Sequence, residues 1–401
     1  MCIKQTRDIF YIALKKSIHC RQCNLMCCFA TIIILIFAYK QAQSFPLKYQ
    51  GKSPSDSTKK SPPDFEWQLS GSTEAAVIPD GVLKSGVTYD HVIHLDGIFH
   101  TEKVGLNGGR LLASVVQITS GLPSDHYIGD IQIASNISAQ PSFRIYELSY
   151  TQNLPGHFVA AAGLIDMNKF FVKDDHASTL LNSSFGISPD IADNVPASIY
   201  PKPGLGISVA KYFSHWKLQA SFFQNDPQQR NSFNLHKNMV TFETDYKSER
   251  GITRLPVTLK GGFWHHTKIQ TLPGTQPHSD WGYYLIAQQR VYQSKYRSAG
   301  IFLQWGSCPV SRVQVPYYLG VGMLVNGPLN DRPKDQFSLG IAKAWTNRQL
   351  SDAETSYEMT YLWQIIEPLS IQPDIQYIEH PAGLMRLHSF VFFLRLNFEV
   401  D

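Results

Sequence analysis

The sequence has little charge and no long helical pattern. Only 17% of its 401 residues are Asp, Glu, Lys or Arg, whereas about 25% is usual for soluble proteins. Beyond residue 44 no amphipathic helix pattern of convincing length appears, so the apolar residues are not spaced to pack helices together. Aromatic residues are plentiful instead, with 23 Phe, 19 Tyr and 7 Trp. This composition favours one large all-β domain.

Cysteine is almost absent from most of the chain. Five of the six cysteines lie within the first 28 residues, and only Cys308 lies beyond them. No intrachain disulfide can form once that first segment is removed. Cys20 and Cys23 have a zinc-like spacing, but His19 is the only histidine near them and the flank is apolar, so we expect no metal. We expect no cofactor either.

Residues 1–44 have the features of a secretory signal peptide. Positive charges precede an apolar stretch over residues 26–39, and Ala42 and Ser44 are small residues two apart, as signal peptidase requires. Six Lys or Arg and one Asp give this segment a charge of +5, so the rest carries −1 of the total of +4. The net positive charge of the chain therefore comes from the export signal and does not indicate a nucleic-acid partner.

The segment after the leader differs from the remainder. Residues 45–85 begin with a stretch rich in Ser, Pro and Lys, which predicts a linker or periplasmic N-terminal arm. From Val87 onward, short alternating runs are separated by Gly, Pro, Asn and Asp clusters. In the last run one face carries aromatic and aliphatic residues: Phe390, Phe392, Leu394, Leu396 and Phe398. Arg395 and Asn397 lie on the other face, and residues 317–325, 357–363 and 369–377 alternate in the same way.

Three features distinguish a membrane barrel from a soluble sandwich, which also alternates. The runs last about nine to eleven residues, the length that a tilted strand needs to cross a bilayer. Aromatic residues recur near the run ends, as the interfacial girdles of a barrel require. The leader exports the chain beyond the inner membrane. Closure into a barrel follows, because an open sheet edge in lipid would leave backbone groups unpaired.

The number of runs sets the size of the barrel. We count about fifteen, starting near Val87, Leu111, Phe143, Phe158, Leu205, Trp216, Met239, Val257, Trp281, Ala299, Tyr317, Phe337, Ser356, Leu369 and Ser389. Bacterial single-chain barrels have even strand numbers, so one strand is missing from the count. We place it around residues 127–134. The prediction is an antiparallel transmembrane β-barrel of about 16 strands over residues 86–401, of the bacterial outer-membrane porin type.

Several longer stretches carry a family resemblance. In chain order they include SFRIYELSYTQ, AAGLIDMNKFF, LLNSSFGISPDIADNVPASIYPKPGLG, AGIFLQWGS, YYLGVGMLVNGPLNDRPKD, SLGIAKAW and LSIQPDIQYIEHPAG. They resemble the carbohydrate-selective porin family called OprB-like, over residues 89–398. The resemblance implies a sixteen-stranded outer-membrane channel for monosaccharides, with loops folded inward to narrow the pore. It also implies outer-membrane lipids and the barrel assembly machinery as partners, and a monomer or a trimer.

The resemblance also suggests residues for the pore. Glu147 should face the lumen while Tyr146, Leu148 and Tyr150 meet lipid. A second group lies on the stretch expected to form the constriction: Asp166, Asn168, Asn182 and Ser184. Arg332 and Asp335 belong to another shared motif. From the alternation alone, further candidates for the lumen are Arg290, Gln288, Gln372, Asp374 and Gln376. Each of them also fits a plain polar wall or an ion pair between strands.

Two positions depart from the family pattern. Ala161 stands where the family usually has an Arg, and the chain continues past Phe398 instead of ending on an aromatic residue. The first departure keeps a general, non-selective porin open as an alternative. A secreted carbohydrate-binding β-sandwich is the third hypothesis.

Enzymatic motifs are weak. The run 206–210 resembles a nucleophile elbow but lacks its final Gly and has no helix after it, and His265 and His266 point to opposite faces of a strand. We therefore expect a transport protein, not an enzyme.

Overall fold

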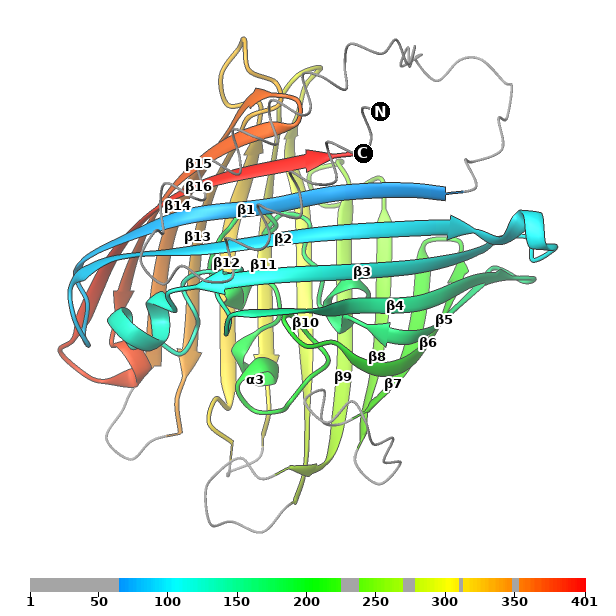
Figure 1. The fold of residues 1–401 in the computed structure, drawn as a ribbon, viewed down its shortest axis with the longest axis horizontal. Helices are drawn as coiled ribbons and strands as arrows, with labels where there is room; N and C mark the ends of the chain where they lie inside the picture. Colours follow the sequence, from blue (N-terminus) through cyan, green and yellow to red (C-terminus); the bar gives the residue numbers. More distant parts are fainter. Residues whose placement is uncertain (1–64, 225–237, 270–277, 310–312, 348–352) are drawn as a thin grey trace, which may run out of the picture. The chain divides into compact units, whose positions relative to one another are not determined.

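The chain forms a single closed sheet of sixteen antiparallel strands. The computed structural model describes residues 65–224, 238–269, 278–309, 313–347 and 353–401. Each strand pairs with its neighbours in the sequence, and β1 pairs with β16 to close the barrel. Figure 1 shows the first strand, in blue, beside the last strand, in red. A closed single sheet excludes the β-sandwich hypothesis, which requires two packed sheets.

The strands are long and the helices short. The strands are β1 Phe65–Asp80, β2 Gly86–His100, β3 Gly109–Ser120, β4 Ser142–Leu154, β5 Phe158–Ile165, β6 Gly204–Phe213, β7 Trp216–Gln224, β8 Asn238–Ser248, β9 Val257–Ile269, β10 His278–Gln293, β11 Ser298–Ser307, β12 Tyr317–Asn326, β13 Gln336–Trp345, β14 Ala353–Ile366, β15 Leu369–Glu379 and β16 His388–Val400. The helices are η1 Thr101–Val104, η2 Ser124–Ile128, η3 Met167–Lys169, η4 Ser183–Phe185, α3 Pro189–Ala192 and η5 Pro381–Gly383. Among the described residues, no helix is long and apolar enough to cross a membrane.

Alternation along each strand separates an apolar outer face from a buried inner face. On β16, Phe390, Phe392 and Leu394 are exposed to different degrees, from 38% to 58%. Their neighbours Val391, Phe393 and Arg395 are at most 5% exposed. Large side chains left exposed in this regular way are expected where lipid replaces water outside the wall.

Fifteen of the strands start within a few residues of the predicted positions, but the sixteenth lies elsewhere. Residues 127–134 form no strand, because they belong to the end of η2 and an irregular segment after it. The missing strand is β1, Phe65–Asp80, inside the segment predicted as a linker or arm. The barrel therefore begins at Phe65 and not at residue 86. The predicted signal peptide and residues 45–64 lie outside the described residues.

The two ends of the barrel differ in their connections. Short turns join β4 to β5, β6 to β7 and β14 to β15, at the end where β1 begins and β16 stops. The opposite end carries residues 121–141, between β3 and β4, and residues 166–203, between β5 and β6. We call these the first and second long connection. Outer-membrane barrels place their short turns on the periplasmic side and their long loops outside.

Candidate functional site

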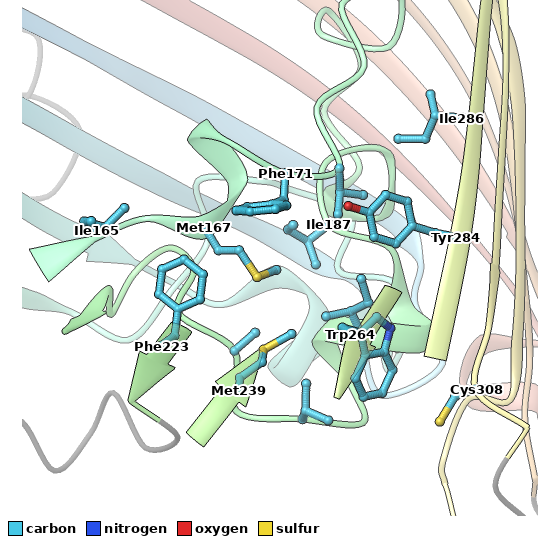
Figure 2. Close-up of a cluster of buried hydrophobic side chains, with 14 of the residues drawn as sticks. Ile165, Met167, Phe171, Ile187, Phe223, Met239, Trp264, Tyr284, Ile286 and Cys308 are labelled. Carbon is cyan, nitrogen blue, oxygen red and sulfur yellow. The ribbon is translucent and has the colours of Figure 1, made fainter. Parts of the chain in front are cut away.

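The second long connection packs against one side of the inner wall through an apolar cluster. Its residues Met167 and Phe171 are fully buried against Phe223 of β7, Met239 of β8 and Trp264 of β9. Figure 2 shows these side chains converging between the connection and the strands. The sequence predicts a polar interior throughout. The inner face is apolar here because the chain itself fills that part of the barrel.

Hydrogen bonds show that this connection crosses the interior. The backbone N–H of Val172 donates to Glu243 of β8 at 2.9 Å. Ten residues later, the N–H groups of Leu181 and Asn182 donate to Glu358 of β14. Since β8 and β14 lie on separate parts of the wall, the connection spans the space between them.

Glycines in the wall make room for the same connection. A Cβ atom at Gly300 would lie 2.4 Å from the ring of His176, and one at Gly306 would lie 2.1 Å from the carboxylate of Asp190. A Cβ at Gly340 would lie 2.5 Å from the ring of Phe185. Any larger residue at these wall positions would push the connection away from the strands.

Two short turns shape the connection locally. Asp166 accepts a hydrogen bond from the N–H of Asn168 at 2.9 Å, at the start of η3. Asn182 accepts from the N–H of Ser184 at 3.1 Å, at the start of η4. Asp and Asn favour such turns because their side chains reach the backbone two residues on. These predicted site residues therefore also fix the path of the backbone.

Glu147 and Asp166 form a buried polar cluster with two partners. Glu147 pairs with Lys169 and accepts the N–H of Asp166 at 3.0 Å. The hydroxyl of Tyr146 donates to the carboxylate of Asp166. Burial raises the pKa of Asp166 to about 6, although its hydrogen bonds from Tyr146 and Asn168 act in the opposite direction.

The prediction that Tyr146 meets lipid is wrong. Tyr146 is 5% exposed and its side chain lies inside the barrel. The register of β4 against β3 shifts between Ser114 and Val115, which leaves an extra residue on β4. Such a bulge places two consecutive side chains on one face. Tyr146 and Glu147 therefore both point inward, while Leu148 is exposed on the outer face.

Two cavities occupy the part of the interior that the long connections leave free. One encloses about 1060 Å³ and is lined by both long connections, including Asp166, Asn168 and Asn182. The other encloses about 720 Å³ and reaches the short-turn end at Glu367 and Asp401. Six residues line both cavities and mark their junction: Val92, His94, Asn136, Ile137, Ser178 and Leu180.

The other predicted residues are not among those that line both cavities. Arg332 forms an ion pair with Asp335 at 2.6 Å, and both lie in the short connection between β12 and β13. Arg290 is near the short-turn end of β10 and donates to Gln293. Asp374 is buried on the inner face of β15. Ser184 is buried too, with its hydroxyl on Asn182. The structure thus brings together only part of the predicted set.

Two residues that line the larger cavity, His94 and Tyr200, escaped the sequence reasoning. His94 of β2 packs edge-on against Tyr146, with ring centroids 5.1 Å apart, and Tyr200 lies 6.1 Å from Tyr146. The Tyr200 hydroxyl donates to the carbonyl of Ile137, which joins the two long connections. His94 lies on the inward-facing side of an alternating run, so the pattern contains a signal for it. Tyr200 has no such signal, because it lies in an irregular connection.

Docking of the second long connection should weaken as the pH rises. Burial raises the pKa of Asp190 to about 7 and, aided by Asp130 and Asp190, that of Asp193 to about 8. A carboxyl with a raised pKa favours the docked state while it is protonated, and ionising it costs docking free energy. Each carboxyl loses this free energy between the usual pKa of 3.8 and its raised pKa, so we expect protease cleavage within residues 166–203 to accelerate from about pH 4 to about pH 8 and to level off above that. The variant Asp190→Asn/Asp193→Asn stays neutral and should show a flatter pH profile, after correction for the pH dependence of the protease. An equally steep profile in the variant would contradict the assignment.

The fold and the interior define a class of protein. The described residues form a closed sixteen-stranded antiparallel barrel with an apolar outer face, long connections inside and open cavities. These features are those of a bacterial outer-membrane channel of the porin type. Solved structures agree on the fold. A high-pH structure of Pseudomonas putida OprB has a TM-score of 0.75 at 16% identity, covering 84% of this chain and 94% of that one. A porin mutant of Rhodopseudomonas blastica has a TM-score of 0.54 at 12% identity, covering 84% of this chain and all of that one.

Sequence comparison identifies the family. The family model of the carbohydrate-selective porin, OprB family, matches residues 96–399, so the chain belongs to this family. Porin B of Pseudomonas aeruginosa is 22% identical over 219 residues, which are 42% of this chain. The match spans about half of that relative, 48% of its length. The chain is therefore an outer-membrane porin and not an enzyme.

Proposed function

We propose that the chain lets small carbohydrates of the size of glucose diffuse passively through the barrel, along a path that the two long connections narrow. The junction of the two cavities supports this proposal. It carries the imidazole of His94 and the amide of Asn136, and the aromatic ring of Tyr200 lines the larger cavity beside it. Lys169 and Asp166 line the larger cavity beside it.

These groups match the chemistry of a neutral sugar. A sugar offers hydroxyl groups around its rim, which charged and amide side chains bind, and apolar faces, which aromatic rings cover. Of the residues predicted from the sequence, Asp166, Asn168 and Asn182 line the larger cavity and remain candidates for sugar contacts. Glu147 supports them from behind, through Lys169 and the backbone of Asp166. Binding must stay weak, because a tightly held solute would not leave the channel.

One observation favours a second function, a general porin without a sugar site. Ala161 is 4% exposed and belongs to the apolar cluster of Figure 2, so no cation projects from this position. If the family's usual Arg holds the sugar, this channel discriminates less among solutes. Lys169, which lines the larger cavity together with Asp166 and Asn168, then supplies a cation beside the predicted constriction residues.

Single-channel recording in a planar bilayer tests the choice. We expect glucose to reduce the current and raise its noise in a concentration-dependent way, beyond the effect of a viscosity-matched polymer too large to enter. The variant His94→Ala should weaken this block by about ten-fold, because one lost polar contact costs about 1–1.5 kcal/mol. Leu384→Ala, at an exposed residue outside both cavities, is the matched control. A current that glucose leaves unchanged up to high millimolar concentrations would leave only the general porin.

A further inference from the structure

We infer that Glu354 and Glu358 of β14 are the residues that position both long connections inside the barrel and so set the width of the permeation path. The inference rests on the proposed function for its meaning in transport. The contacts that carry it are independent of any sugar.

Each glutamate holds two consecutive backbone N–H groups. Glu354 accepts from Ile131 and Gln132 of the first long connection, both at 2.9 Å. Glu358 accepts from Leu181 and Asn182 of the second, the latter at 3.0 Å. The two carboxylates lie four residues apart on one strand, so they share its inner face. One strand therefore holds both connections by the same type of contact.

Both carboxyl groups are buried, so the loss of their hydrogen bonds costs more free energy than it would in water. Glu354 is fully buried and Glu358 is 3% exposed. Glu354 also accepts the N–H of Ala382 from the connection between β15 and β16 at 2.6 Å. A carboxyl group offers two acceptor oxygens, so one side chain can hold both neighbouring N–H groups. Without the carboxylate, the two amide groups would face the interior of the barrel with no acceptor in its place.

The two connections are also joined to each other. The N–H of Asn136 donates to the carbonyl of Leu181 at 2.7 Å, and the N–H of Ser183 donates to the carbonyl of Ile133 at 2.9 Å. Gln376 of β15 donates to the carbonyl of Ala134 at 2.8 Å and accepts from the side chain of Asn182 at 3.3 Å. The connections thus form one body that β14 and β15 hold in place, and releasing one connection should loosen the other.

The position of this body relates it to transport. Asn136 and Leu180 line both cavities, and they lie next to the residues that the glutamates hold. A displacement of Leu181 or of residues 131–132 therefore moves the junction of the cavities. Glu354 and Glu358 need not touch a solute for this, because they act through the backbone of the connections.

Variants at the two glutamates test the inference in the full-length barrel. We expect Glu358→Ala to increase trypsin cleavage after Lys169, Lys173 or Lys202 at least about ten-fold, which corresponds to about 1.4 kcal/mol of lost docking free energy. Single-channel conductance should rise and become noisier. Glu358→Gln keeps one acceptor oxygen, so its effects should be intermediate. Glu354→Ala should expose the first connection to chymotrypsin at Tyr127. The matched control is Glu379→Gln, at an acid near the end of β15 that accepts a hydrogen bond from the hydroxyl of outward-facing Tyr357.

The outcomes separate this inference from the proposed function. Heat-modifiable migration on a denaturing gel must show that each variant still forms the barrel. If conductance and cleavage match wild type in folded Glu354→Ala and Glu358→Ala, the two residues do not position the connections. If wild type shows no glucose block while these variants still widen the channel, the sugar site is wrong and the positioning role stands.

Discussion

Replacing Arg395 by alanine is expected to destabilise the barrel by about 3–5 kcal/mol, because a buried carboxylate then loses its counter-charge. Arg395 of β16 lies directly opposite Glu74 of β1, at the seam where the barrel closes. Its Nε donates to Glu74 at 2.7 Å. Both side chains are buried, at 6% and 0% exposure. The pair therefore stabilises the strand contact on which closure depends.

The same arginine also donates hydrogen bonds to the first long connection inside the barrel. Its Nη1 donates to Asn136 of the first long connection at 2.9 Å, and its Nη2 donates to Ser135 at 3.3 Å. Asp90 and Asp374 are the other acids that interact with this pair. Removing the guanidinium leaves three acids in one region of the interior.

A neutral double variant provides the control for Arg395. Glu74→Gln/Arg395→Gln keeps a polar side chain at both positions and removes both charges together. Its loss of stability should be much smaller than that of Arg395→Ala, since no charge is left unpaired. The measurement is the urea concentration at which the heat-modifiable form unfolds in lipid vesicles. Equal losses in the two variants would show that the ion pair contributes little.

The substitution Leu339→Arg, on the outer face of β13, should lower the free energy of unfolding in a bilayer by about 2–4 kcal/mol. Leu339 is 38% exposed, and its cross-strand neighbours are Met323 of β12 and Met359 of β14. These apolar neighbours indicate hydrocarbon around this position, where a guanidinium has no partner. The unfolding midpoint in urea should fall accordingly.

Ile252 is the control position for Leu339, because it faces water instead of lipid. It is 98% exposed in the short connection between β8 and β9. Ile252→Arg makes the same chemical change where the charge stays solvated, so stability should remain within about 0.5 kcal/mol of wild type. If both arginine variants are equally stable in vesicles, the outer face of β13 does not contact lipid.

The alternating pattern predicted most of the wall because lipid and interior impose opposite demands on successive residues. It failed at β1 for a physical reason. The outer face of β1 carries Phe65, Trp67, Leu69 and Val77 towards its ends. Its middle carries Gly71, Thr73 and Ala75, which are too small to continue the apolar pattern. A Cβ at Gly71 would lie 2.7 Å from the ring of Phe398, so a residue of β16 covers that position. The apolar surface exists there, but the neighbouring strand supplies it.

The site was less predictable than the wall. Asp166 and Asn182 were proposed because they lie in motifs of the family resemblance, and both line the larger cavity. Tyr146 could not be placed correctly, because the bulge that turns it inward depends on pairing with β3. The contacts of Glu358 with Leu181 and Asn182 use backbone groups that carry no side-chain signal. Arg290 follows the polar pattern, and Arg332 and Asp335 lie in a motif of the family resemblance, yet all three lie near the short-turn end.

The attachment of both long connections to β14 has a consequence for biogenesis. The hydrogen bonds to Glu354 and Glu358 join residues that are 176 to 223 positions apart. Such distant contacts form slowly because a long loop must close first. Until β14 is in place, neither long connection has the acceptors of Glu354 and Glu358, so assembly of the C-terminal part of the wall is what gives the channel a defined bore.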